Sequence, residues 1–199
     1  MSRRPYPFLL PILGVFLVAC TTAATPAPTA QADPTSGPVV ETQSATLAPA
    51  AAAIEPWRTI AMQDVRSGET FAVADLAGKL VVLEPMAIWC GNCERQQQAA
   101  SEALSAIDSD DVVYISLDVD PGEATADLAA YADKHGFDWR FVVAGREMSR
   151  ALATSFGDQV LAPPSTPKIL VTPGGDAVGP LFGVSDPEAL ERELLEHLS

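Results

Sequence analysis

The 199-residue chain has few of the residues that commonly hold metals, with three cysteines and two histidines in all. A structural zinc site needs four ligands, usually a second C-x-x-C or a histidine pair at a suitable distance. The third cysteine, Cys20, and the two histidines, His135 and His197, do not stand in such spacing. We therefore expect neither a metal nor another cofactor.

Basic residues are also scarce, because 12 lysines and arginines stand against 26 acidic residues and the formal net charge is −14. Only Arg3, Arg4, Asp33 and Glu41 precede residue 55, so the remaining charges belong to the rest of the chain. Such an acidic chain is unsuited to binding nucleic acid or to binding anionic lipid electrostatically. Solubility of the domain is a sufficient explanation of the charge. The sequence also has no evident repeat, nucleotide-binding loop or basic stripe.

The N-terminal apolar run is too short to span a bilayer comfortably, since Phe8 to Ala19 is about a dozen residues long. It follows Arg3 and Arg4, which predicts an export signal. Its ending, Leu17-Val18-Ala19-Cys20, resembles a bacterial lipobox, in which the chain is cut before the cysteine and the cysteine is acylated. We expect residues 1–20 to be a lipoprotein signal peptide and Cys20 to be a lipid anchor. An ordinary cleaved signal with an incidental cysteine is the alternative, and in both cases the domain works outside the cytoplasm.

Residues 21–54 have no aromatic side chain and hardly any charge, and they consist mostly of Thr, Ala, Pro, Ser, Gln and Val. Such a composition cannot bury enough apolar surface to form a core, so we expect a disordered tether. The remainder, residues 55–199, is long enough for one compact core but too short for two domains of ordinary size.

The chemistry of the sequence is concentrated at Trp89-Cys90-Gly91-Asn92-Cys93, between the apolar run 80–88 and a stretch with helical spacing. A thiol on the first turn of a helix faces unpaired N–H groups and the positive end of the helix dipole, which favour its thiolate. Cys90 is therefore the candidate nucleophile. Cys93 lies about one turn further on the same face, near enough to close a small disulfide ring with Cys90.

Two other readings of this motif remain open at this point, a metal site and a static structural disulfide. The chain lacks further ligands in zinc spacing. A disulfide across a two-residue loop on a helix would stabilise the fold very little. Redox cycling between dithiol and disulfide is thus the favoured reading.

The pattern along residues 55–199 alternates strands with helices and ends in a hairpin and a last helix. This predicts an α/β fold with a βαβ half followed by a ββα half. The turn 173–176, Pro-Gly-Gly-Asp, joins the last two strands, and Pro187 opens the final helix after Ser185 or Asp186 as cap. The expected strands are near 57–62, 69–73, 80–87, 112–118, 140–144, 168–172 and 177–182, and the expected helices near 92–108, 122–135, 146–156 and 186–198.

A strand, the W-C-x-x-C motif, a helix, and then Thr166-Pro167 before a hairpin resemble the layout of the thioredoxin superfamily. The resemblance extends over nearly all of residues 55–199 and is closest to membrane-tethered, extracytoplasmic thiol-disulfide oxidoreductases of the TlpA/ResA type. It implies a three-layer α/β fold with a mixed central sheet flanked by helices, an N-terminal β extension and an inserted βα unit at 112–135. It also implies that Cys90 attacks a partner disulfide and that Cys93 resolves the mixed disulfide.

Further site residues follow from the same resemblance. Pro167 would be the family's cis proline beside the cysteine pair, and Thr166 would offer its backbone N–H and C=O to an extended partner chain. Trp89 would cover the rim of the site and contact partners, although a tryptophan at a strand end is often part of the core. Gly91 and Asn92, between the cysteines, would help to set the redox poise without revealing its direction.

Glu84 is the only charge in the apolar run that should form a central strand buried on both faces. Burial should raise the pKa of this carboxyl group, and it could then take and return the proton of Cys93. It stands six residues before Cys90, which is the position of the buried aspartate of thioredoxins. Pro85 cannot donate a ladder hydrogen bond, so we expect a bulge in this strand. The alternative for Glu84 is that it merely points to solvent at this bulge. Relatives often keep a glutamate where this chain has Gln96, which leaves Glu84 as the carboxylate candidate.

Other classes of protein fit the residues less well. A copper-binding assembly factor of the SCO type would need C-x-x-x-C and a distal histidine. A peroxiredoxin would place its cysteine in a T-x-x-C setting. A non-catalytic binding lipoprotein would explain the anchor but not the Cys90–Cys93 motif.

The sequence thus predicts an enzyme, a thiol-disulfide oxidoreductase that reduces or exchanges disulfides in exported proteins. We expect it to be lipid-anchored on the extracytoplasmic face of a bacterial membrane, or secreted if Cys20 is not acylated. Its expected partners are protein disulfides or dithiols and a membrane electron donor. Its expected biological roles include redox homeostasis and cytochrome c maturation. The lean towards the reductase direction comes from the family resemblance alone.

Overall fold

The computed structural model describes residues 54–198, so the signal-like segment, Cys20 and nearly all of the expected tether lie outside the described residues. Within that range the first element is a short 3₁₀ helix, Pro56–Arg58. Among residues 54–198, no helix has both the length and the apolar character that crossing a bilayer requires.

A five-stranded mixed sheet forms the middle of the domain, in the order β5-β4-β3-β6-β7. Strands β3 (Leu80–Met86), β4 (Val112–Asp118) and β5 (Arg140–Val143) run parallel, and β6 (Lys168–Val171) runs antiparallel to β3. Strand β7 (Ala177–Leu181) completes a hairpin with β6 through the predicted turn. Every residue of β3 is buried, as expected of the central strand in a sheet covered on both faces.

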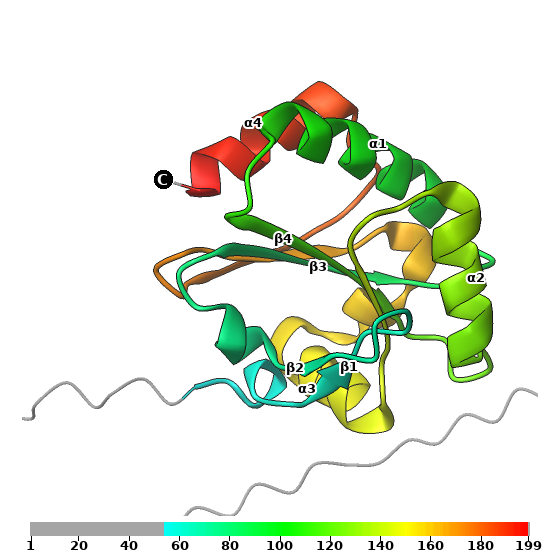
Figure 1. The fold of residues 1–199 in the computed structure, drawn as a ribbon. Coiled ribbons are helices and arrows are strands. Elements are labelled where there is room, and N and C mark those ends of the chain that lie inside the picture. The colour runs from blue at the N-terminus through cyan, green and yellow to red at the C-terminus, as the bar shows by residue number, and fades with distance from the viewer. Residues whose placement is uncertain (1–53, 199) are drawn as a thin grey trace, which may run out of the picture. The chain divides into compact units, whose positions relative to one another are not determined.

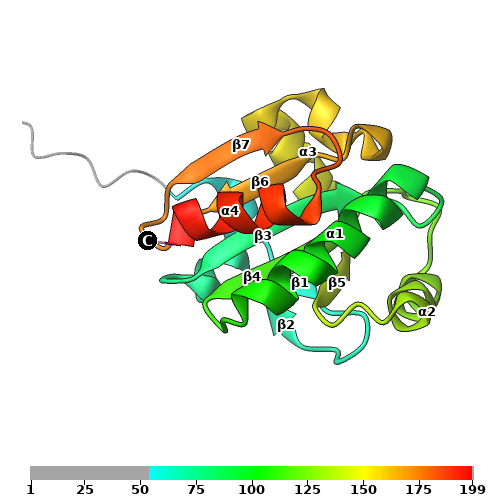
Figure 2. The same ribbon diagram turned by 90° about the horizontal axis from the view of Figure 1, so that it is seen from above.

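Helices cover both faces of the sheet and give the three layers that the sequence predicts (Figure 1). Helices α1 (Gly91–Ile107) and α4 (Pro187–Leu198) lie side by side on one face, as Figure 2 shows from above. Helix α3 (Arg146–Phe156) lies on the opposite face with the N-terminal elements, and α2 (Thr125–His135) packs against β5.

Alternation along β3 decides which side chains meet which layer. Leu80 and Val82 pack with Leu190 and Leu194 of α4, whereas Val81 and Leu83 belong to the core that contains Leu152 of α3. Glu84, two residues after Val82, therefore faces the layer of α1 and α4. This register brings an ionisable group beneath the helix that carries the cysteines.

The N-terminal extension differs from its prediction. In place of strands at 57–62 and 69–73, it has the 3₁₀ helix and a minimal hairpin of β1 (Met62–Gln63) and β2 (Thr70–Phe71). Pro56 opens the 3₁₀ helix, and Trp57 is fully buried with its ring 5.5 Å from that of Phe156. Burial of one large ring has thus overridden the β propensity of the segment.

The bulge expected at Pro85 is absent, because β3 keeps an uninterrupted register with β4 from Leu80 to Met86. Strand β6 pairs with β3 only over Val81–Leu83, so Pro85 lies beyond that antiparallel ladder and its missing N–H leaves it intact. The register shift in the sheet lies instead between β6 and β7.

Candidate active site

Cys90 and Cys93 form a disulfide at the start of α1, with their Cα atoms 5.3 Å apart. Cys90 is the N-cap residue of α1, and its sulfur accepts a hydrogen bond from the backbone N–H of Cys93 at 3.2 Å. An anionic sulfur at Cys90 would be stabilised by this N–H and by the end of the helix dipole. The predicted pairing and its place on the helix are therefore present in the structure.

A short 3₁₀ turn, Pro163–Ser165, covers the cysteine pair from the side of β6. The Cys93 sulfur lies 3.2 Å from the carbonyl oxygen of Pro163, a position in which the reduced thiol would donate a hydrogen bond. Asn92 donates its side-chain N–H to the next carbonyl, that of Pro164, at 2.8 Å. The residue between the cysteines thus fastens α1 to this turn, a role that the sequence did not reveal.

Trp89 lies at the rim of the site and is 60% exposed, which rules out the core position. Its indole N–H donates to Asp120 at 2.7 Å, and this bond lowers the pKa of the Asp120 carboxyl. The preceding peptide N–H, that of Ile88, donates to the carboxylate oxygens of Glu123 at 2.9 and 3.1 Å. The loop after β4 therefore holds the Trp89 turn through two carboxylates.

A third carboxyl, that of Asp118, lies beneath this loop and is fully buried at the end of β4. Burial raises its pKa to about 7, and the negative charges of Glu123 and Asp120 act in the same direction. Sequence reasoning missed these three residues. The available signal was their place after a strand parallel to β3, because the carboxyl ends of parallel strands meet at one edge.

Glu84 is fully buried in the layer between β3 and α1, as the sequence predicts. Its Oε2 accepts hydrogen bonds from Gln97 Nε2 and from the Ser116 hydroxyl, both at 3.2 Å. Burial raises the pKa of Glu84 to about 8, while these two hydrogen bonds and the charge of Lys168 act in the opposite direction. The solvent-exposed alternative for Glu84 is therefore wrong.

The partners of Glu84 belong to a longer buried network. Tyr131 on α2 donates to Gln97 Oε1 at 2.7 Å, and the Trp139 indole N–H donates to Ser116 at 2.9 Å. Gln97 follows Cys93 by four residues and so lies one turn along the same face of α1. The buried carboxyl group of Glu84 and the second cysteine are thereby linked to one helix face.

Gln96, which stands where relatives often keep a glutamate, has a structural contact instead. Its side-chain oxygen accepts a hydrogen bond from the Ser185 N–H at 2.8 Å, just before α4. It is fully buried and joins the starts of two helices.

The prediction of a cis bond before Pro167 is wrong for this structure. Among residues 54–198 the cis peptide bond is Gly179–Pro180, and Thr166–Pro167 is trans. Thr166 adopts a left-handed conformation with φ 44°, and its N–H donates to the Pro163 carbonyl at 2.8 Å. The turn that covers the cysteines thus uses the N–H that was expected to bind a partner chain, and Pro167 follows through a trans bond, immediately before β6.

Exposed apolar side chains flank the backbone contact between Gly183 and the turn that covers the cysteine pair. Phe182 is 44% and Val184 41% exposed, and the N–H of Gly183 between them donates to the Ser165 carbonyl at 2.9 Å. On the other side a shallow hollow includes Trp89 and Pro163; its full lining is Trp89, Val119, Asp120, Pro121, Leu161 and Pro163. The surface around Cys90 therefore offers apolar contacts to an approaching chain.

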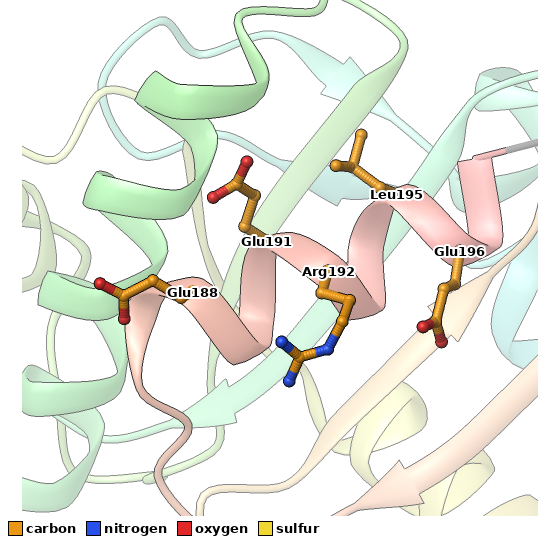
Figure 3. A pocket seen from close by; sticks show the side chains of 5 residues that line it. All are labelled: Glu188, Glu191, Arg192, Leu195 and Glu196. Carbon is orange, nitrogen blue, oxygen red and sulfur yellow. The ribbon is translucent and has the colours of Figure 1, made fainter.

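A separate depression lies on α4 (Figure 3) and is lined by Glu188, Glu191, Arg192, Leu195 and Glu196. It contains charged side chains but neither cysteine, and it is open to solvent. The described residues hold no group of three or more His, Cys, Asp or Glu placed to bind a metal ion.

Comparison with known proteins identifies the architecture. No family model matches the chain, and no curated protein matches it. A thioredoxin-family thiol:disulfide interchange protein from Chlorobium tepidum TLS superposes with a TM-score of 0.58 at 18% identity, over 70% of this chain and 93% of that one. The fold is thioredoxin-like.

Two further structures have the same thioredoxin-like fold. One is a secreted Mycobacterium tuberculosis disulfide oxidoreductase homologous to E. coli DsbE, with TM-score 0.56, 15% identity, and coverage of 70% of this chain and 97% of that one. The other is BsSco of the Sco family of cytochrome c oxidase assembly proteins, with TM-score 0.56, 16% identity, and coverage of 69% and 90%. At these identities the likeness establishes the fold, and the activity must be argued from the site.

Proposed function

We propose that this thioredoxin-like protein is a thiol-disulfide oxidoreductase that acts on the disulfides of exported proteins. The observation that carries the proposal is the Cys90–Cys93 disulfide at the N-terminus of α1, the helix whose Gln97, one turn after Cys93, binds the buried Glu84 carboxyl of raised pKa. Perturbed ionisable groups beside a reactive pair are typical of active sites.

In the reductive direction the Cys90 thiolate attacks one sulfur of a partner disulfide, and the other partner sulfur leaves and takes up a proton. The Cys93 thiol then gives its proton to Glu84 in the fraction of molecules in which this carboxyl, with its pKa of about 8, is ionised, and the Cys93 sulfur attacks Cys90. The partner sulfur that was bound to Cys90 in the mixed disulfide then leaves and is protonated. Two electrons have moved from the dithiol to the partner, which ends as two thiols, and the protein ends as the disulfide seen here.

Renewed turnover needs a reductant of the dithiol class, and we assign this role to a membrane electron donor. Cys20, as a lipid anchor, would hold the domain at the extracytoplasmic face of the membrane. Replacing Cys20 with serine should move the full chain from the membrane fraction into the soluble extract. Unchanged partition would argue against acylation.

Trapping tests the assigned roles of the cysteines. In the full chain with Cys20→Ser, the Cys93→Ser variant should accumulate mixed disulfides through Cys90, because the resolving sulfur is gone. The Cys90→Ser variant is the matched control and should accumulate few. Equal trapping by both variants would contradict the assignment of the nucleophile.

The redox potential of the Cys20→Ser chain, measured by thiol trapping in dithiothreitol or glutathione buffers, decides the direction. A reversible couple below about −230 mV supports a reductase, and one above about −180 mV an oxidase or isomerase. Absence of a reversible two-electron couple would overturn the proposal and favour a non-catalytic binding role.

A copper-binding role, suggested by the Sco neighbour, finds less support at this site. A copper site of that type would need a histidine ligand, and the contacts of His135 are with other groups. Its Nδ1 lies 3.6 Å from Glu94 Oε1, and its ring stacks on Phe137 with centroids 5.4 Å apart. Tight, stoichiometric copper binding that depends on both Cys90 and Cys93 would revive that candidate.

A further inference from the structure

Lys168 is a buried charge that the reaction just described does not use. It is 2% exposed and is the first residue of β6, immediately after Pro167. Lysine is almost never fully buried unless it is paired, because its ammonium loses hydration. Its position therefore requires an explanation from its surroundings.

The sheet register places Lys168 beside Glu84. Strands β3 and β6 are antiparallel, with Val82 opposite Leu170 and Leu83 opposite Ile169. Lys168 and Glu84 are the next residues of the two strands beyond this ladder, and their charges interact. Leu170 packs in the core shared with α4, so alternation turns Lys168 towards the same face.

A single backbone contact anchors the lysine. Its Nζ donates to the Gly183 carbonyl at 2.8 Å, which leaves two further ammonium protons for longer-range interaction. Strand β7 presses closely on this site, because a Cβ at Gly179 would lie 2.8 Å from the Lys168 carbonyl oxygen. The Lys168 backbone is thus packed closely against β7, and its ammonium group is held by the Gly183 carbonyl, two residues after that strand.

One of the two carboxyl oxygens of Glu84 lacks a hydrogen-bond partner. Its Oε1 is buried and has no hydrogen-bond partner, whereas Oε2 has two. The titratable groups that interact with the pair are Tyr114 on β4, Tyr131 on α2 and Glu193 on α4. Among these groups Lys168 is the cation, and its charge favours the ionised form of Glu84.

We propose that Lys168 is a positioning residue for the proton transfer at Glu84, with its buried ammonium stabilising the Glu84 carboxylate that receives the Cys93 proton. The proposal rests on the proposed function for its catalytic meaning, but its electrostatic content can be measured without any turnover. Burial lowers the pKa of Lys168, while Glu193 and Glu84 act in the opposite direction. Lys168 and Glu84 therefore support each other's charged forms.

The competing explanation is that Lys168 only anchors the exposed loop at Gly183. Lys168→Gln separates the two roles, because the amide keeps an N–H donor for the Gly183 carbonyl but removes the charge. Lys168→Arg retains the charge and serves as the rescue variant. Lys79→Met is a matched control, because Lys79 also donates to a backbone carbonyl, that of Asp110 at 2.7 Å, but near the start of β3.

The test is a titration of the Glu84 carboxyl by carbon NMR in the oxidised full chain with Cys20→Ser. We expect Lys168→Gln to move the Glu84 midpoint upwards by about one to three pH units, the usual effect of losing a nearby opposite charge. Lys168→Arg should restore most of the shift, and Lys79→Met should leave the midpoint in place.

An unchanged midpoint in Lys168→Gln would overturn the proposal, and so would an equal shift in Lys79→Met. Should the glutamine variant fail to fold, Lys168→Met and Lys168→Arg provide the same comparison of neutral and charged side chains. For the reduced protein, the midpoint of the pH profile of mixed-disulfide resolution should move in the same direction. Failure of the proposed function would appear as a missing redox couple and would leave the NMR result intact.

Discussion

Replacing Glu84 with glutamine should make the stability of the oxidised protein less dependent on pH. The fold raises the pKa of this carboxyl from 4.5 to about 8. Between these two values the folded state holds one more proton than the unfolded state, so stability falls as pH rises. One pH unit across this window corresponds to about 1.4 kcal/mol, which gives about 4–5 kcal/mol in total. Glutamine cannot ionise and removes this loss.

Urea unfolding of the Cys20→Ser chain at several pH values between 4 and 9 measures the effect. The free energy of unfolding of Glu84→Gln minus that of wild type should increase through the window and level off outside it. Glu188→Gln, on an exposed turn of α4, is the matched control. A difference that stays constant from pH 4 to 9 would refute the buried, protonated carboxyl.

Two more predictions concern the frame of the site. Gly179→Ala should destabilise the fold by about 2–4 kcal/mol, because φ is 110° and the added Cβ would lie 2.8 Å from a backbone oxygen. The control Gly145→Ala, at a position with open space around it, should change thermal stability far less. Equal effects of the two substitutions would contradict the packing argument. Asp120→Asn should abolish the acid titration of the Trp89 indole N–H resonance, which in wild type should follow a carboxyl whose pKa is lowered by that bond. An indole resonance that titrates identically in both proteins would show that this hydrogen bond does not form in solution.

The central elements could be predicted from the sequence because their signals are local. The run 80–88 has the continuous apolar character of a strand buried on both faces, and the cysteine spacing fits one helical turn. Burial of Glu84 followed from the same run, since a strand covered on both faces offers no exit to solvent. The observed bounds of β3 and α1 differ little from those expected.

The supports of the site could not be predicted, because they join residues far apart in the chain. Trp89 and Asp120 are 31 residues apart, and Gln97 and Tyr131 are 34 apart. The packing of the helices on the sheet decides which polar side chains form hydrogen bonds with one another. The geometry at Thr166 was missed for a related reason, because its N–H is used by the preceding turn.

The carbonyl of Pro163 makes the covering turn sensitive to the oxidation state of Cys93. In the dithiol form the Cys93 thiol can donate to this oxygen across 3.2 Å, whereas the sulfur of a disulfide has no proton to give. A hydrogen bond present in one state alone contributes about 0.5–1 kcal/mol in favour of that state. For a two-electron couple this corresponds to about 10–20 mV towards a more oxidising potential. One main-chain oxygen thus slightly weakens the reducing power of the Cys90–Cys93 dithiol and strengthens the disulfide as an oxidant.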